Sequence, residues 1–154
     1  MLSPDLEETL RRALSIAGER SHEFATLEHL LLALIDDEDA IGVLKGCKVD
    51  ISELRDLLVN HIEDELSSIV NPSENLEVQP TAGFQRVVQR AIIHTQSSGR
   101  GAATGANILI AMYSERESYA VWFLNSLNMS RLDAVSFVSH GNGGPVQGTD
   151  KSDD

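Results

Sequence analysis

Residues 26–34 read TLEHLLLAL, and residues 104–111 read TGANILIA. Each segment places a threonine, a residue that caps helices well, before apolar residues at helical spacing. The two threonines are 78 residues apart, and so are the apolar runs that follow them. The same separation joins RAL at 12–14 to RAI at 90–92, which indicates an internal repeat. We therefore expect two similar helical units, each burying the apolar face that the other exposes.

The chain divides into two helical repeats and a tail. Helical apolar spacing fills residues 3–66 and again residues 81–140, and four helices are expected in each. Residues 67–80 carry two prolines and several polar side chains, so they are expected to connect the repeats. The prediction is an all-α fold of about eight helices packed as one domain over residues 1–141. Residues 142–154, rich in glycine and polar side chains, are expected to form a flexible linker.

The charge of the chain is unevenly distributed. The chain has 154 residues and a net charge of −12. Residues 1–75 hold 17 acidic and six basic side chains, a net charge of −11, whereas residues 76–144 carry +1. This acidity argues against a nucleic-acid partner, because phosphates would be repelled. It fits either a solvated acidic face or a mixed-charge surface for a protein partner, and both interpretations stay open.

The single cysteine and the first residues of the chain indicate where in the cell the protein is found. The single cysteine, Cys47, cannot form an internal disulfide, which fits a reducing cytoplasmic setting. The opening segment MLSPDLEETLRR is acidic and contains Pro4, unlike a signal peptide or a membrane span. We therefore expect a cytoplasmic protein with no membrane partner.

The sequence shows no recognisable catalytic set. It contains no phosphate-binding loop of the form GxxxxGK(S/T), and its histidines are not spaced as metal ligands. We therefore expect no enzymatic activity and no cofactor for this chain. Two alternatives remain: a metal-dependent hydrolase that uses His22, His61 and Glu63, and a self-associating structural module. His22 and Glu63 could also hold a metal ion adventitiously at the surface, without any catalytic role.

Several other side chains have a structural interpretation. His29 lies inside the first apolar run and is expected to be buried or to cap a helix. Tyr119, Trp122 and Phe123 fall at helical spacing and are expected in the core.

Two arginines on the second repeat have two interpretations. Arg86 and Arg90 are four residues apart on the helix expected after Thr81, so they share a face. They fit a solvated surface. Because guanidinium is a planar fork of donors, they also fit a clamp for a partner's carboxylate.

Six segments, taken in order, are more specific than general helical sequence. Together they closely resemble the amino-terminal domain of the ClpA-type unfoldases, the ATP-driven component of the bacterial Clp protease, over about residues 2–141. The segments are HEFATLEHLLLAL (22–34), PTAGFQRVVQRA (80–91), SSGR (97–100), TGANILIA (104–111), SERES (114–118) and SRLDAVSFVSHG (130–141).

The resemblance implies a mobile helical domain that a linker joins to two ATPase modules. Those modules are not in this chain, and they would use ATP and Mg. The whole protein would form a hexamer that docks on the ClpP peptidase, whereas the isolated domain would be a monomer. In that family the domain binds the adaptor ClpS, which delivers protein substrates with destabilising amino-terminal residues (N-degrons), and it also influences direct substrate engagement.

The resemblance also implies an adaptor-facing surface. Glu23 and Glu28 would be exposed there and would receive lysines or arginines of the adaptor. Such pairs at the rim of an interface contribute only about 0.2 to 1 kcal/mol each, so apolar contacts would supply much of the affinity. At the positions of this sequence that match the ClpA-type motifs, the surface would comprise Glu23, Glu28, Thr81, Arg86 and Arg90. His22 and Glu63 would lie nearby.

Overall fold

The computed structural model describes residues 2–65, 77–99 and 101–140. Eight α-helices lie in this part of the chain, which confirms the all-α prediction. They are α1 (Pro4–Glu19), α2 (Leu27–Leu34), α3 (Glu38–Gly46), α4 (Ile51–Glu65), α5 (Ala82–Ser98), α6 (Gly105–Met112), α7 (Tyr119–Ser126) and α8 (Arg131–Ser139). The linker predicted at 142–154 and residues 67–76 of the predicted connection lie outside the described residues.

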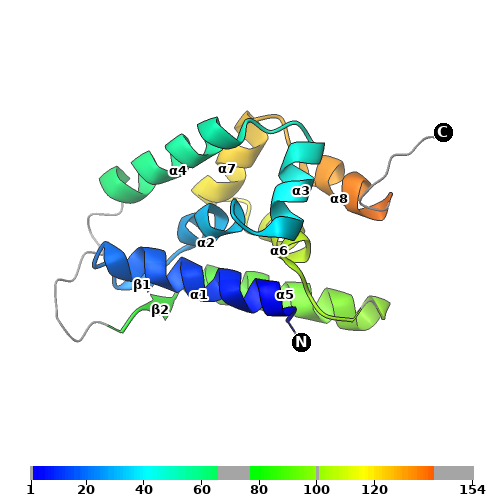
Figure 1. Cartoon of the computed structure of the whole chain (residues 1–154), viewed down its shortest axis with the longest axis horizontal. Coiled ribbons are helices and arrows are strands. Elements are labelled where there is room, and N and C mark those ends of the chain that lie inside the picture. The colour runs from blue at the N-terminus through cyan, green and yellow to red at the C-terminus, as the bar shows by residue number, and fades with distance from the viewer. Residues whose placement is uncertain (1, 66–76, 100, 141–154) are drawn as a thin grey trace.

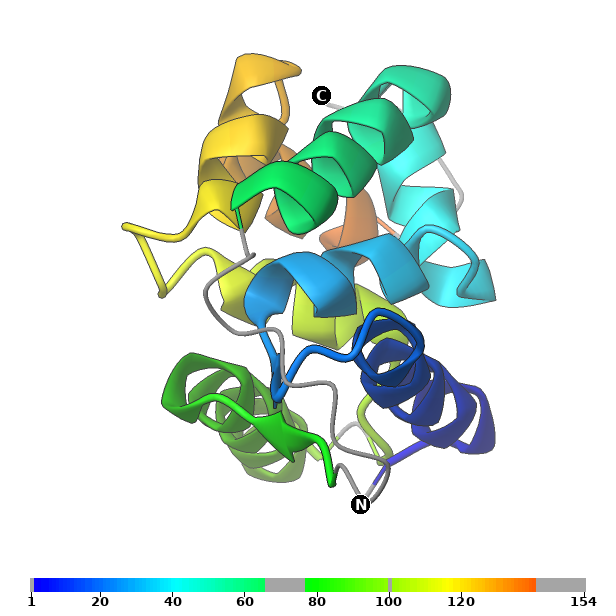
Figure 2. The ribbon, with the colours of Figure 1, turned by 90° about the vertical axis from the view of Figure 1, so that its left-hand side faces the viewer.

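The helices form three layers, which Figures 1 and 2 show from two directions. The first helices of the repeats, α1 and α5, lie side by side in one outer layer, and α2 and α6 form the middle layer. The other outer layer holds α3, α4, α7 and α8. Both middle helices have eight residues, and they begin 78 residues apart, as the repeat predicts. Each middle helix also contacts the third helix of the other repeat, α2 with α7 and α6 with α3, so the two repeats interlock.

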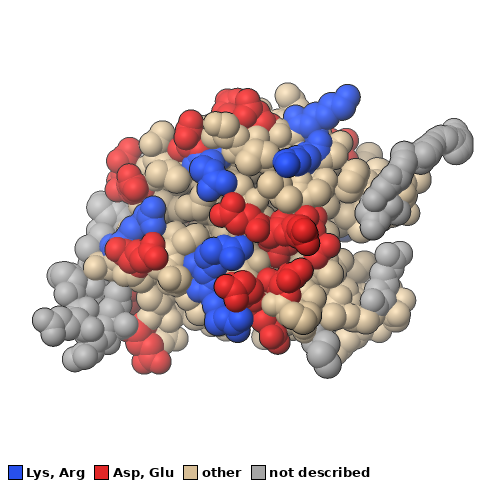
Figure 3. Space-filling view, viewed as in Figure 1, with Lys and Arg blue, Asp and Glu red and all other residues tan. Residues whose placement is uncertain are grey.

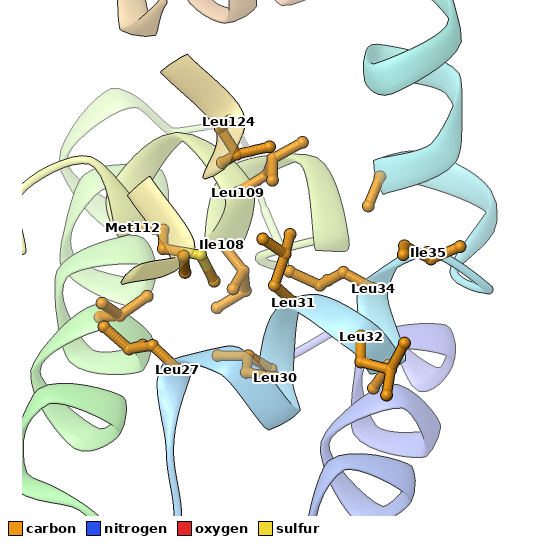
Figure 4. Packing of buried hydrophobic residues seen from close by; sticks show 14 of the residues in the cluster. Leu27, Leu30, Leu31, Leu32, Leu34, Ile35, Ile108, Leu109, Met112 and Leu124 are labelled. Atoms are coloured by element: carbon orange, nitrogen blue, oxygen red, sulfur yellow. The ribbon is translucent and has the colours of Figure 1, made fainter. Parts of the chain in front are cut away.

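The middle layer lies at the centre of the core (Figures 1 and 2). Every residue of α2 is buried, so this helix has no solvent face on which to place a polar side chain. Its leucines, among them Leu30, Leu31 and Leu34, pack toward Ile108 and Leu109 of α6 (Figure 4). The two polar residues of α2, Glu28 and His29, must therefore find partners inside the protein, because burying an unpaired polar group is costly.

Side-chain caps begin three of the helices, at Thr26 and Thr81 as the sequence predicts and also at Ser3. Ser3 caps α1 ahead of Pro4, Thr26 caps α2, and Thr81 caps α5. Each of these hydroxyls accepts a hydrogen bond from a backbone N–H group that has no partner within its helix.

A buried aspartate holds three helices together. One carboxylate oxygen of Asp37 accepts from Ala40 N (3.0 Å) and so caps α3, while the other accepts from the Thr9 hydroxyl of α1 (2.7 Å). Gly105, the first residue of α6, lies so close that an added Cβ atom would sit 2.2 Å from Asp37 Oδ1. A glycine is therefore required at this junction between the repeats.

The prediction that three aromatic residues lie in the core is wrong for two of them. Tyr119 is 55% exposed and Trp122 is 62% exposed, whereas Phe123 is buried as predicted. Residues three apart share one face of a helix, and this face of α7 points to solvent. The opposite face, which carries Ala120 and Phe123, packs inward.

Two short parallel strands were not predicted from the sequence. Strand β1 (Phe24–Ala25) pairs with β2 (Gln79–Pro80), with Phe24 opposite Gln79. The strands join the segment between α1 and α2 to the segment just before α5. No helix in the described residues is both long and apolar enough to cross a membrane.

Candidate protein-docking site

The strand pair brings two predicted site residues together. Glu23 O accepts a hydrogen bond from Gln79 N, and Ala25 O accepts one from Thr81 N, both at 3.0 Å. Thr81 is half-buried because its hydroxyl caps α5 by accepting from Phe84 N at 3.2 Å. Glu23 is exposed, as predicted. The predicted proximity of residues from the two repeats is therefore present at this edge.

The prediction that Glu28 is exposed is wrong. Only 7% of this residue is accessible, and its Oε2 accepts a hydrogen bond from Ala120 N at 2.9 Å. Ala120 lies in the first turn of α7, where backbone N–H groups have no partner within the helix and favour negative charge. His61 Nε2 of α4 lies 4.0 Å from the other carboxylate oxygen. Glu28 thus ties α2 to α7, and it is not available to an approaching lysine.

Arg86 has a partner within the protein. Its Nε and Nη2 bind the two carboxylate oxygens of Glu115 at 2.9 and 2.7 Å, a bidentate pair between α5 and the loop before α7. The hydrogen bonds from Arg86 hold the pKa of the Glu115 carboxyl below its usual range, and they raise the pKa of the guanidinium. More than half of the arginine side chain is exposed, whereas 17% of the glutamate side chain is exposed. The pair therefore presents one rigid guanidinium to solvent.

We define the docking face as five residues on the strand pair, the start of α5 and the segment that leads into α7: Glu23, Thr81, Arg86, Glu115 and Tyr119. It runs from the strand pair along the start of α5 to the loop that leads into α7. Figure 2 shows this loop, in yellow, between α5 and α7. Arg90 is exposed one turn further along α5 and lines a separate groove beside α6 and α8.

The sequence did not indicate Glu115 or Tyr119 as site residues. Glu115 is 29 residues from its arginine and has no pairing signal at helical spacing. The exposure of Tyr119 depends on which face of α7 meets α2 and α4, and the spacing of aromatic residues does not specify that. The segment SERES contains the glutamate, so the resemblance was the available signal.

Two buried histidines, His22 and His29, are hydrogen-bonded to each other. His29 Nδ1 accepts from the backbone N–H of Thr26 at 2.9 Å, so it carries no proton. The proton is then on Nε2, which lies 2.9 Å from His22 Nδ1 and donates to it. Burial, followed by the neighbouring His22, lowers the pKa of His29 to about 3. The prediction that His29 is buried or capping is confirmed, and it does both.

The alternative of a metal-dependent hydrolase is not supported. His22 is hydrogen-bonded to His29, and His61 lies against the ring of Tyr119 with centroids 4.5 Å apart. Glu63 lies 3.7 Å from Arg20 in an ion pair. Within the described ranges, no three histidine, cysteine, aspartate or glutamate side chains form a group that could hold a metal ion. His22, His61 and Glu63 therefore have separate partners.

The surface charge reflects the excess of acidic residues in the first half of the sequence. On the face of the molecule shown in Figure 3, acidic side chains gather over the first repeat and are interspersed with lysine and arginine. In the docking face, three charged side chains of both signs stand beside an exposed aromatic ring. Such a surface suits a folded protein or a peptide better than a polyanion.

Comparison with known proteins identifies the family. A family model described as the Clp repeat (R) N-terminal domain matches residues 1–127. A protein named ClpA homolog protein, from Fuscovulum blasticum, is 51% identical over 157 residues, covering 97% of this chain and 20% of the relative. The chain therefore belongs to the Clp repeat N-terminal domain family. The resemblance to ClpA-type proteins is confirmed by this relative, of which the chain spans about one fifth of the length.

Solved structures show the same fold at low sequence identity. The Hsp104 N-terminal domain from Candida albicans has a TM-score of 0.74 at 15% identity, covering 92% of this chain and 93% of that chain. A complex of the ClpV N-domain with a VipB peptide has a TM-score of 0.69 at 20% identity, covering 90% of this chain and 84% of that chain. These similarities concern the fold alone.

Proposed function

We propose that this chain is the recruitment domain of a ClpA-like, ATP-dependent protein unfoldase in the cytoplasm. In this proposal it docks the adaptor ClpS and through it receives substrates with N-degrons. The observation that carries the proposal is the 51% identity to a ClpA homolog over nearly the whole chain. ATP hydrolysis with Mg, assembly into a hexamer and docking on ClpP would belong to the remainder of the protein, because this chain matches one fifth of that relative.

The docking face has the composition that an adaptor site needs. Affinity at protein interfaces comes mainly from a few aromatic and arginine anchors, and charged pairs at the rim set orientation and association rate. Tyr119 and Trp122 supply exposed aromatic rings on one side of α7. Arg86 supplies a guanidinium that Glu115 already holds in place, so little side-chain entropy is lost on binding. Glu23 supplies an exposed acid for a cationic side chain of the adaptor.

Glu28 has a different role in this proposal from the one its position first suggested. Because its carboxylate caps α7, it fixes where that helix begins and hence where Tyr119 stands. A substitution at Glu28 would weaken adaptor binding by displacing α7, and the lost contact with the adaptor would not be the cause.

A fold of this kind is suited to holding a protein segment. The ClpV N-domain, which has this fold, has been solved with a VipB peptide. That complex supports the idea that the double repeat is a scaffold for protein recognition.

Calorimetric titration of this chain with the adaptor ClpS tests the proposal. We expect a saturable one-to-one complex that Tyr119→Ala weakens at least about ten-fold, as expected for an aromatic anchor. Glu23→Lys should weaken binding about two- to five-fold, because it reverses a rim charge. The matched control is Arg11→Gln, which removes an exposed arginine of α1 that pairs with Glu8. A lack of saturable binding, or equal losses in Arg11→Gln and Tyr119→Ala, would overturn the proposal.

The mass of the free chain in solution separates this role from a self-associating module. The proposal expects a monomer of 16.8 kDa by light scattering. A mass of about twice that value at micromolar concentration would favour the self-associating module instead.

A further inference from the structure

A groove separate from the docking face runs between α5, α6 and α8. It has a volume of about 500 Å³. Three arginines line it from three different elements: Arg90 on α5, Arg116 in the loop after α6, and Arg131 at the start of α8. His94, one turn beyond Arg90, lines it too. All four of these side chains are exposed.

The lining of the groove contains no carboxylate among the described residues. None of its three arginines forms an ion pair within the described part of the chain. The nearest acids lie outside the lining: Glu115 is held by Arg86, with Arg90 also helping to lower its pKa, and Glu117 lies with Arg116 in an adjoining shallow hollow. In a chain with a net charge of −12, three clustered arginines without an acidic partner are unusual. Their positive charge is available to a ligand.

The floor of the groove is apolar. Ile110 of α6 and Val135 and Val138 of α8 line it between the arginines, and all three are partly buried. Two aromatic rings line the groove: His94, which is exposed, and Tyr113, which is buried and donates its hydroxyl hydrogen to Met129 O at 2.6 Å. The groove therefore offers guanidinium groups at its rim and aliphatic side chains at its base, and the imidazole of His94 is the one exposed aromatic ring among its described lining residues.

We propose that this groove binds a short acidic peptide segment of a protein partner, whose carboxylates pair with Arg90, Arg116 and Arg131 while its aliphatic side chains cover Ile110, Val135 and Val138. Arginine suits this role because its planar donors pair with both oxygens of a carboxylate. A nucleic acid fits less well, because single strands bind through a long basic track and aromatic stacking. The strongly acidic first repeat would also repel a polyanion that extended beyond the groove.

This inference is independent of the proposed adaptor function. Neither Arg116 nor Arg131 belongs to the docking face, but Arg116 lines a shallow hollow together with Glu115. Arg131→Gln is therefore the substitution that addresses the groove alone. Arg90 is left unchanged in the test, because the resemblance also places it on the adaptor surface. A loss of adaptor binding with unchanged binding of the acidic peptide would count against the adaptor function alone. A loss of peptide binding with unchanged adaptor binding would count against the groove alone.

The test is fluorescence anisotropy of a labelled peptide of alternating glutamate and valine, titrated with the chain at low salt. We expect saturable binding that weakens with added salt, and no comparable binding of the peptide with lysine in place of glutamate. Arg116→Gln and Arg131→Gln should each weaken binding about two- to five-fold. Arg55→Gln is the matched control, since it removes an exposed arginine of α4 far from the groove lining.

Three results would overturn the inference. The first is the absence of saturable binding to the glutamate peptide. The second is an equal loss in Arg55→Gln and Arg131→Gln, which would indicate a general charge effect. The third is tighter binding of an oligothymidylate of the same charge, which would make the groove a nucleic-acid site. Glu23→Lys should bind the glutamate peptide as the unmodified chain does, because Glu23 lies on the docking face.

Discussion

Mild acid should destabilise this protein through the buried histidine pair. His29 is completely buried, and both its ring nitrogens are committed: Nδ1 accepts from the Thr26 N–H, and Nε2–H donates to His22. A second proton on Nδ1 would point at the N–H group that now donates to it. The folded protein therefore holds this imidazole neutral, with a pKa of about 3, whereas the same side chain in the unfolded chain titrates near 6.5.

The sign and size of the effect follow from proton linkage. As the pH falls below about 6.5, the unfolded chain binds a proton at position 29 that the folded protein does not bind, so stability decreases. The contribution of His29 to the free energy of unfolding is complete above about pH 6.5, and it decreases as the pH falls to about 3. Each pH unit in this window costs up to about 1.4 kcal/mol, which gives a loss of about 2 kcal/mol between about pH 7 and about pH 5 from this histidine alone.

Urea unfolding at the two pH values, followed by circular dichroism, measures this loss. His29→Gln removes the titrating ring but keeps an acceptor for the Thr26 N–H, since glutamine commonly fills this place in a capping box. We expect its loss between about pH 7 and about pH 5 to be less than half that of the unmodified chain. His94→Gln, at an exposed position on α5, is the control and should lose as much as the unmodified chain. Equal losses in His29→Gln and the unmodified chain would refute the reasoning.

Two further predictions concern contacts between the repeats. Gly105→Ala should lower the free energy of unfolding by about 1 to 3 kcal/mol, because the new methyl group would overlap the buried Asp37 carboxylate. Gly42 lies in the interior of α3 with open space around it, so Gly42→Ala should raise the free energy of unfolding by about 0.5 to 1 kcal/mol. Chemical denaturation distinguishes them, and equal effects would contradict the proposed close approach. Glu28→Ala should cost about 1 to 3 kcal/mol and increase hydrogen exchange at the Ala120 amide, whereas Glu28→Gln should cost less because its amide oxygen still accepts. Unchanged exchange at Ala120 in Glu28→Ala would show that this cap is not formed.

Local patterns predicted most of the fold. Apolar spacing and capping residues act within one or two turns, so Thr26 and Thr81 could be placed at helix starts from the sequence. The 78-residue separation then predicted that the second half would repeat the first. The strands β1 and β2 were missed because two-residue strands have no periodicity to detect.

The site was predicted less completely, because its contacts join distant parts of the chain. Glu28 looks like an exposed acid in the first turn of a helix, and only the arrival of α7, 92 residues later, buries it. Arg86 was correctly placed on an exposed face, but its partner Glu115 lies in a loop of irregular structure. In the same way, the spacing of Tyr119 and Trp122 predicted that they share a face without indicating that this face is exposed.

The central claim is that the edge joining the two repeats is where the domain receives its adaptor. Hydrogen exchange of the chain, measured by mass spectrometry with and without the adaptor ClpS, tests it most directly. We expect protection in residues 23–25 and 79–86 and in the segment 113–122 that leads into and begins α7, with α3 and α8 unchanged. Protection confined to α3 and α8, or no protection at saturating adaptor, would contradict it.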